Sequence, residues 1–218
     1  MSTIASGRPF RRPLVKFCGL TRTSDADAVN RVRPDFVGFV FAGNGPRRIT
    51  FEKARAIKER LIDSIATVGV FDGEEPATIL SLVHEGLINA IQLHGAESTR
   101  YVRDLVWAIR SRGRRTPVIQ AFTIHTEGDA MRAGASPADL VLLDAGAGLG
   151  RPFDWNLIKD FRRSFILAGG LSAENVADAL RRTRPIGLDV SSGIKTDGLN
   201  DIRKMKAFMA AIEKEDPQ

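Results

Sequence analysis

Short apolar segments alternate with longer amphipathic segments along most of the chain. The apolar segments are near-continuous runs, which is typical of parallel strands that are buried on both faces. The amphipathic segments have helical spacing; Phe51, Ala54, Ile57 and Leu61, for example, share one face. We predict strands at residues 14–19, 35–41, 65–71, 88–93, 117–122, 139–144, 164–170 and 187–193. We predict helices at residues 23–32, 49–61, from 75 onward, 97–112, 128–133, 154–161, 172–182 and 199–213.

Eight consecutive strand–helix units indicate an α/β fold, and a closed (β/α)8 barrel (a TIM barrel) is favoured. An open, doubly wound sheet is the alternative that the pattern leaves. The sequence has no Pro- or Ser-rich linker that would divide it. We therefore predict one catalytic domain at residues 14–218, preceded by a flexible N-terminal tail at residues 1–13.

Composition narrows the possible partners. The chain has 218 residues with a net charge of +6 and a pI of about 9.9. Its arginines are scattered and aromatic residues make up only 7%, so a stacking platform for nucleic acid is not expected. A small anionic substrate suits the charge instead. No segment approaches the ~20 apolar residues that a membrane span needs, and residues 1–14 do not resemble a secretory signal. We expect a cytoplasmic protein with no membrane or nucleic-acid partner.

Polar and glycine residues gather where the predicted strands end, which is where a barrel carries its chemistry. The stretches AGGLS and DVSSG follow strands seven and eight. Loops at these two positions commonly bind phosphate through backbone N–H groups. We predict that the glycines and serines of this pair, Gly169, Gly170, Ser192 and Gly193, form a phosphate site.

Three titratable groups also lie at predicted strand ends. Cys18 is the only cysteine, and strand alternation places it on the same face as Lys16, which we assign to the barrel interior. Cys18 is then either a small packing residue or a reactive thiol. Asp144 is either a structural cap or an acid–base group. His94 is either a third titrating group or a histidine held by a loop hydrogen bond.

The motifs VKFCGLTR, GFVF with GPRR, VGVF, IQLHG, FDW, LAGGLSAENV and GLDVSSG occur in this order, and together they resemble the phosphoribosylanthranilate isomerase family. The resemblance extends from Leu14 to the last helix. It implies an Amadori rearrangement of N-(5-phosphoribosyl)anthranilate to 1-(2-carboxyphenylamino)-1-deoxyribulose 5-phosphate. This is an aldose–ketose type isomerisation in tryptophan biosynthesis, and it uses neither a metal nor an organic cofactor.

The resemblance also assigns roles. Cys18 would be the general base, which favours a thiol pKa drawn towards neutrality, and Asp144 would be the general acid. Arg47 would hold the anthranilate carboxylate, although the adjacent Arg48 could exchange roles with it. His94 would lie against substrate. Asp189 would bind a ribose hydroxyl or pair with Lys16.

The loop AGAGLGRP departs from the family pattern, because Arg151 stands where a lysine is usual.

Rival interpretations are another phosphate-binding barrel enzyme, either a ribulose-phosphate epimerase or indole-glycerol-phosphate synthase, and a barrel that binds a phosphorylated ligand without chemistry. The epimerase would need metal ligands at the strand ends, and the synthase would need a lysine–glutamate set there. The predicted strand ends have neither set. The sequence leaves both a monomer and a homodimer open.

Overall fold

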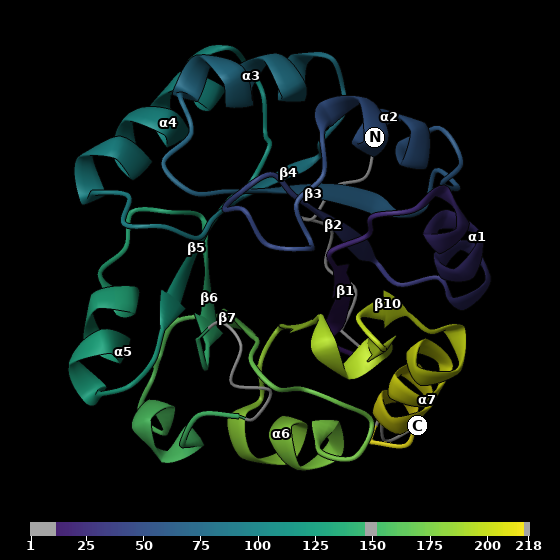
Figure 1. The fold of residues 1–218 in the computed structure, drawn as a ribbon. Helices are drawn as coiled ribbons and strands as arrows, with labels where there is room; N and C mark the ends of the chain where they lie inside the picture. Colours follow the sequence, from purple (N-terminus) through teal and green to yellow (C-terminus); the bar gives the residue numbers. More distant parts are fainter. Residues whose placement is uncertain (1–11, 147–151, 216–218) are drawn as a thin grey trace.

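A computed structural model describes residues 12–146 and 152–215. Within these residues eight parallel strands form one closed barrel in chain order, because β1 pairs with both β2 and β8 (Figure 1). The predicted (β/α)8 barrel is confirmed, and closure excludes the open sheet. The strands are β1 Leu14–Cys18, β2 Phe36–Val40, β3 Ala66–Phe71, β4 Ala90–Leu93, β5 Val118–Thr123, β6 Leu140–Asp144, β7 Phe165–Leu167 and β8 Gly187–Val190.

The helices form a ring outside the strands (Figure 1). In the described part of the chain they are α1 Thr23–Val32, α2 Phe51–Lys58, α3 Pro76–His84, α4 Thr99–Ser111, α5 Glu127–Gly134, α6 Val176–Thr183 and α7 Ile202–Glu213. In the sixth unit the predicted helix at residues 154–161 is instead a short 3₁₀ helix, η1 Trp155–Ile158. Predicted helix 172–182 begins later, at Val176, because the preceding residues form turns.

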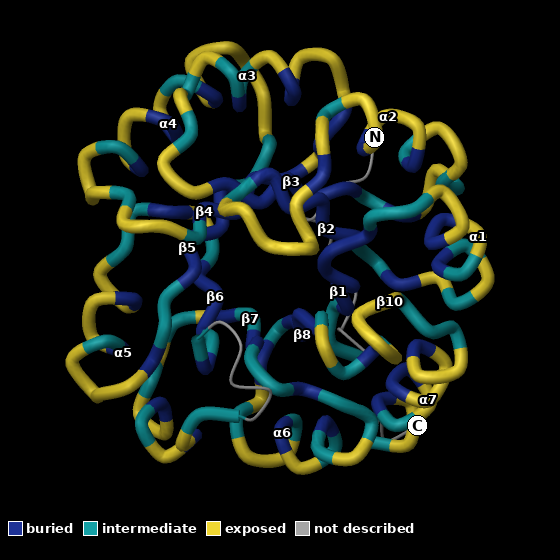
Figure 2. Tube along the Cα trace, viewed as in Figure 1, coloured by how far each residue is buried: buried dark blue, intermediate teal, exposed yellow. Residues whose placement is uncertain are grey.

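The main hydrophobic core lies between the strands and the helical ring, and the buried residues of Figure 2 concentrate there. Phe17 on the outer face of β1 packs edge-on against Phe208 of α7, with ring centroids 6.4 Å apart. A second, smaller cluster, which includes Ile119, Ala121 and Leu142, lies on the inner face of β5 and β6. The period-two alternation of each strand therefore separates a helix-facing core from an inner face that points towards the site.

The segment after β8 differs from the prediction. The predicted helix at 199–213 begins at Ile202, and a small antiparallel hairpin, β9 Lys195–Thr196 with β10 Leu199–Asn200, precedes it. Asp197 and Gly198 form the turn with φ values of +49° and +77°. An Asp-Gly pair is favoured where both turn residues need positive φ, so this hairpin has a local sequence cause. A further short 3₁₀ helix, η2 Ser192–Ile194, connects β8 to it.

The beginning of the described chain is attached to the barrel. The guanidinium of Arg12 pairs with the carboxylate of Asp35, at 2.7 Å between Nη1 and Oδ2. Residues 1–11 of the predicted tail lie outside the described residues, as does Arg151 with most of its loop. Among the described helices, none is both long and apolar enough to cross a membrane.

Candidate active site

Lys16 and Cys18 lie on the inner face of β1, as strand alternation predicts. Both are buried, with 4% and 5% of their surface exposed. Gly38 on the neighbouring strand makes room for them, because a Cβ built there would lie 2.9 Å from Cys18 Sγ and 3.1 Å from Lys16 Nζ. The lone thiol and the lysine therefore occupy space that exists only because β2 has a glycine at this position.

Asp189 on β8 forms an ion pair with Lys16. The two Cα positions are in register across the β1–β8 seam that closes the barrel, and Nζ lies 3.0 Å from Oδ1. Of the two roles that the sequence left open for Asp189, the structure shows the pairing with Lys16. Burial is the largest single effect and lowers the pKa of Lys16, but the charges and hydrogen bonds of Asp189 and Cys18 together outweigh it, and the pKa lies above its ordinary value.

The expected lowering of the thiol pKa is wrong for this structure. Burial raises the pKa of Cys18, because a thiolate loses hydration there. Lys16 opposes the increase, and the negative charge of Asp189 adds to it. The net direction is upward because burial is the largest of these effects.

Asp144 is the last residue of β6 and points into the same end of the barrel. Its side chain is 15% exposed, and Oδ1 accepts a hydrogen bond from the backbone N–H of Gly146 at 3.2 Å. His94, immediately after β4, lies with Nε2 3.8 Å from Asp144 Oδ2. The structure thus brings together the carboxylic acid and the histidine that the sequence selected.

Arg47 and Arg48 point to different partners. Arg47 donates from Nη1 to Ser191 Oγ at 3.3 Å, and this hydroxyl donates to the backbone carbonyl of Cys18 at 3.1 Å. Arg48 instead donates to Asn44 Oδ1 within its own loop. Arg47 is therefore the arginine that lies beside Cys18. Sequence reasoning did not select Ser191, whose only signal was its place in the DVSSG motif.

The two loops chosen as a phosphate site are in direct contact. A Cβ on Gly193 would lie 2.0 Å from the carbonyl oxygen of Leu171, so only glycine permits this approach. Gly170 has φ +61°, and its carbonyl accepts a hydrogen bond from Asn175 Nδ2 at 2.8 Å. Gly169 also leaves room for the Asp144 carboxylate, because a Cβ at Gly169 would lie 2.7 Å from Asp144 Oδ1.

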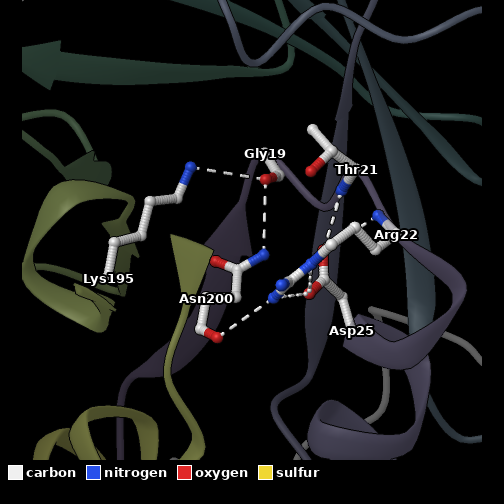
Figure 3. Close-up of polar contacts among 6 residues, drawn as sticks. All are labelled: Gly19, Thr21, Arg22, Asp25, Lys195 and Asn200. Atoms are coloured by element: carbon white, nitrogen blue, oxygen red, sulfur yellow. Dashed lines mark hydrogen bonds and ion pairs between the residues drawn. The ribbon is translucent and has the colours of Figure 1, made fainter. Parts of the chain in front are cut away.

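A polar network holds the loop after β1 against the hairpin after β8 (Figure 3). Asp25 is 1% exposed, and its Oδ2 accepts hydrogen bonds from the backbone N–H groups of Thr21 and Arg22. Arg22 in turn donates to the carbonyl of Asn200 at 3.3 Å. The Lys195 side chain consequently lies over Gly19, with Nζ 3.4 Å from the carbonyl oxygen.

Lys195 was not among the predicted site residues. It was missed because the sequence after Gly193 was interpreted as a connection to a helix, and the Asp197-Gly198 turn signal was not used. A metal site is not apparent either, since no three His, Cys, Asp or Glu side chains gather as ligands in residues 12–146 and 152–215.

A (β/α)8 barrel with a buried thiol, a carboxylic acid and basic side chains at the carboxyl ends of its strands defines an enzyme of the acid–base class that acts on a small anionic substrate. Residues 15–211 match the family model described as N-(5'-phosphoribosyl)anthranilate (PRA) isomerase. The chain belongs to this family and is an isomerase, as the sequence predicted.

Known proteins agree with this assignment. The N-(5'-phosphoribosyl)anthranilate isomerase of Desulforudis audaxviator is 40% identical over 205 residues, which are 90% of this chain and 96% of that protein. The phosphoribosyl anthranilate isomerase of Thermotoga maritima has a crystal structure that matches this chain with a TM-score of 0.82. The two sequences are 36% identical, and the match covers 93% of this chain and 99% of that one. Another similar isomerase structure holds reduced 1-(o-carboxyphenylamino)-1-deoxyribulose 5-phosphate. Its sequence is 37% identical, its TM-score is 0.78, and the match covers 93% of this chain and 98% of that one.

Proposed function

We propose that this chain converts N-(5'-phosphoribosyl)anthranilate to 1-(2-carboxyphenylamino)-1-deoxyribulose 5-phosphate with Cys18 as general base and Asp144 as general acid. One observation carries the assignment of roles. The only thiol of the chain and a carboxyl group both end barrel strands, β1 and β6, on the inner face of the catalytic end. These are the two kinds of group that the rearrangement requires.

The reaction needs two proton transfers by side chains before the enolamine tautomerises to the ketone. Asp144 donates a proton to the furanose ring oxygen as the C1–O bond breaks, and the nitrogen lone pair forms the C=N bond of a Schiff base. The Cys18 thiolate then removes the proton from C2, and the electron pair of that bond forms the C1=C2 bond of an enolamine. Protonation at C1 and loss of the enol proton give the ketone. Both steps are general acid–base catalysis by positioned side chains.

The raised pKa of Cys18 changes how the base operates. At neutral pH the thiolate is the minor form, but a thiolate with a higher pKa is the stronger base once formed. Lys16 stabilises that anion at short range, and Asp189 fixes the lysine in place. This explains why a buried ion pair lies directly beneath the reacting thiol.

His94 and Arg47 are proposed to bind the aromatic half of the substrate. His94 lies 3.8 Å from Asp144, so it can contact the substrate beside the acid. Arg47 presents a planar guanidinium fork, which suits a carboxylate, and it lies beside the backbone of Cys18 through Ser191. The inward contact of Arg47, compared with the loop contact of Arg48, supports Arg47 as the ligand of the anthranilate carboxylate.

The phosphate is proposed to bind between the loops after β7 and β8, at Gly169, Gly170, Ser192 and Gly193. Close contact of Gly193 with Leu171 and the bond from Asn175 to Gly170 hold these loops together. Glycine backbones can approach an anion closely, which supports this location. A phosphorylated metabolite as substrate also agrees with a location in the cytoplasm.

The function can be tested by adding the purified protein to N-(5'-phosphoribosyl)anthranilate generated in situ from anthranilate. The expected result is protein-dependent loss of the anthranilate-type fluorescence with formation of the deoxyribulose product. A protein that binds the substrate but leaves this signal unchanged would contradict the proposal. It would then support the alternative of a barrel that binds a phosphorylated ligand without chemistry.

A further inference from the structure

The hairpin after β8 directs two side chains to one point on the loop after β1. Lys195 and Asn200 are register partners across β9 and β10. Lys195 Nζ lies 3.4 Å and Asn200 Nδ2 lies 3.5 Å from the same carbonyl oxygen, that of Gly19 (Figure 3). These distances are at the outer limit for N–H···O hydrogen bonds, so the contact leaves most of the donor capacity of the ammonium unused.

Arg47 reaches the same point from the other side. Gly19 has φ +86° and no side chain, and a Cβ built there would lie 3.3 Å from Lys195 Nζ and 3.2 Å from Arg47 Cδ. The ammonium and the arginine side chain therefore converge on the space above Gly19. This space adjoins Cys18, the last residue of β1.

Neither cation forms an ion pair with a carboxylate in the part of the chain that the structure describes. Two positive side chains that converge without an intervening anion repel each other, and partial burial adds a desolvation cost. Lys195 shows both effects, because burial lowers its pKa most and the charge of Arg47 lowers it further, while the nearby Cys18 and Asp25 act in the opposite direction. An anion between the two cations would remove the repulsion.

We propose that Lys195 is a substrate-binding residue that holds the anthranilate carboxylate together with Arg47. The inference rests on the proposed function and deepens it, since it identifies a second cation for the same substrate group. Lys195 follows β8, two residues after the proposed phosphate residue Gly193, but its ammonium reaches over Gly19 at the end of β1, where it meets Arg47. The carboxylate is favoured over the phosphate because Arg47 is the proposed carboxylate ligand.

The network around Asp25 gives the lysine its position. Asp25 fixes the backbone at Thr21 and Arg22, and Arg22 holds the hairpin through the carbonyl of Asn200. Lys204 also donates to the backbone carbonyl of Lys195 at 2.5 Å. The hairpin that carries Lys195 is therefore attached on both sides before substrate arrives, which reduces the ordering cost of binding.

The test compares two inhibitors against wild type, Lys195→Met and Lys206→Met. One inhibitor is reduced 1-(o-carboxyphenylamino)-1-deoxyribulose 5-phosphate, and the other is its 1-phenylamino analogue, which lacks only the carboxylate. Loss of one charged hydrogen bond predicts about 10- to 100-fold weaker binding of the first inhibitor to Lys195→Met. Binding of the second should change less than about threefold. The exposed Lys206→Met change controls for the loss of a positive charge on the nearby helix α7.

Two further variants protect the test from a folding artefact. Lys195→Arg keeps the positive charge and should retain most of the affinity for the carboxylated inhibitor. If Lys195→Met destabilises the loop, Lys195→Gln replaces it, because glutamine can still donate a hydrogen bond to the Gly19 carbonyl but carries no charge. Equal weakening of both inhibitors, or no weakening of either, would overturn the role of Lys195 while wild-type turnover leaves the proposed function intact. Absence of both turnover and inhibitor binding in wild type would overturn the function and this inference together.

Discussion

Lys16 Nζ lies 3.0 Å from Asp189 Oδ1 across the seam that closes the barrel, and both side chains are at most 9% exposed. Removing two charges from water costs more than an isolated pair usually returns, so such a pair is weak support for stability. Because the ion pair lies beneath Cys18, it instead affects the pKa of the thiol. The lysine stabilises the thiolate, and Asp189 limits how strongly it does so.

This relationship predicts opposite pH effects of two substitutions. As the proposed general base, Cys18 acts as its thiolate, so kcat/KM should rise with pH through the raised pKa of Cys18. Lys16→Met removes a charge that lowers this pKa and should move the rising limb to higher pH. Asp189→Asn removes a charge that raises it and should move the limb to lower pH. Complete pH–rate profiles of both variants measure this, and a shift of both in the same direction would contradict the account.

Asp144→Asn should lower kcat by roughly 10²–10⁴-fold with little change in KM, because the amide cannot donate the proton that opens the ring. Asparagine can still accept the hydrogen bond from the Gly146 N–H, so the loop should keep its form. Steady-state kinetics beside the exposed Asp63→Asn control measure the effect. A variant with near wild-type kcat would remove Asp144 as the acid.

Arg47→Ala should raise KM by about 10- to 100-fold, the amount expected for a lost charged hydrogen bond, and should change kcat much less. Arg48→Ala is the matched control, because Arg48 donates to Asn44 within its own loop. KM values for both variants decide between the two arginines. A larger effect at Arg48 would show that the roles are exchanged.

Gly38→Ala should impair the base without changing any polar group. The added Cβ would lie 2.9 Å from Cys18 Sγ and 3.1 Å from Lys16 Nζ, so the thiol must move. Overpacking of this kind costs roughly 1–3 kcal/mol of folding stability, and displacement of a reacting group by about 1 Å can cost about 10²-fold in rate. Urea unfolding and kcat measure the two effects.

A matched control exists on helix α5. A Cβ on Gly128 would make only an ordinary contact, 3.5 Å from Thr126 Oγ1. Gly128→Ala should therefore leave both stability and kcat close to wild type. If Gly38→Ala behaves in the same way as this control, the space beside Cys18 is not restricted as described.

The barrel and much of the site could be predicted from the sequence because they depend on local patterns. Alternation places Lys16 and Cys18 on one face, and parallel strands in a barrel all end at the same rim. That common end also explains why Asp144 and His94, which lie at the ends of different strands, come together. These predictions need no knowledge of the distances between side chains.

Other features depend on tertiary distances. The pKa of the Cys18 thiol is raised chiefly by burial, to which the charge of Asp189 adds and which Lys16 opposes, and its direction was predicted incorrectly because the sequence pattern does not show how deeply Cys18 is buried. Arg47 and Arg48 are equivalent in sequence until the loop assigns one of them to Ser191. Lys195 could have been found, since the Asp197-Gly198 turn signals the hairpin that carries it.

The most direct test of the central claim is the kcat of Cys18→Ala beside wild type in the fluorescence assay with N-(5'-phosphoribosyl)anthranilate. We predict a decrease of roughly 10²–10⁴-fold with little change in KM, because alanine fills most of the same buried space but cannot accept a proton. Near-full turnover by Cys18→Ala would contradict the account, and the lone thiol would then be a packing residue.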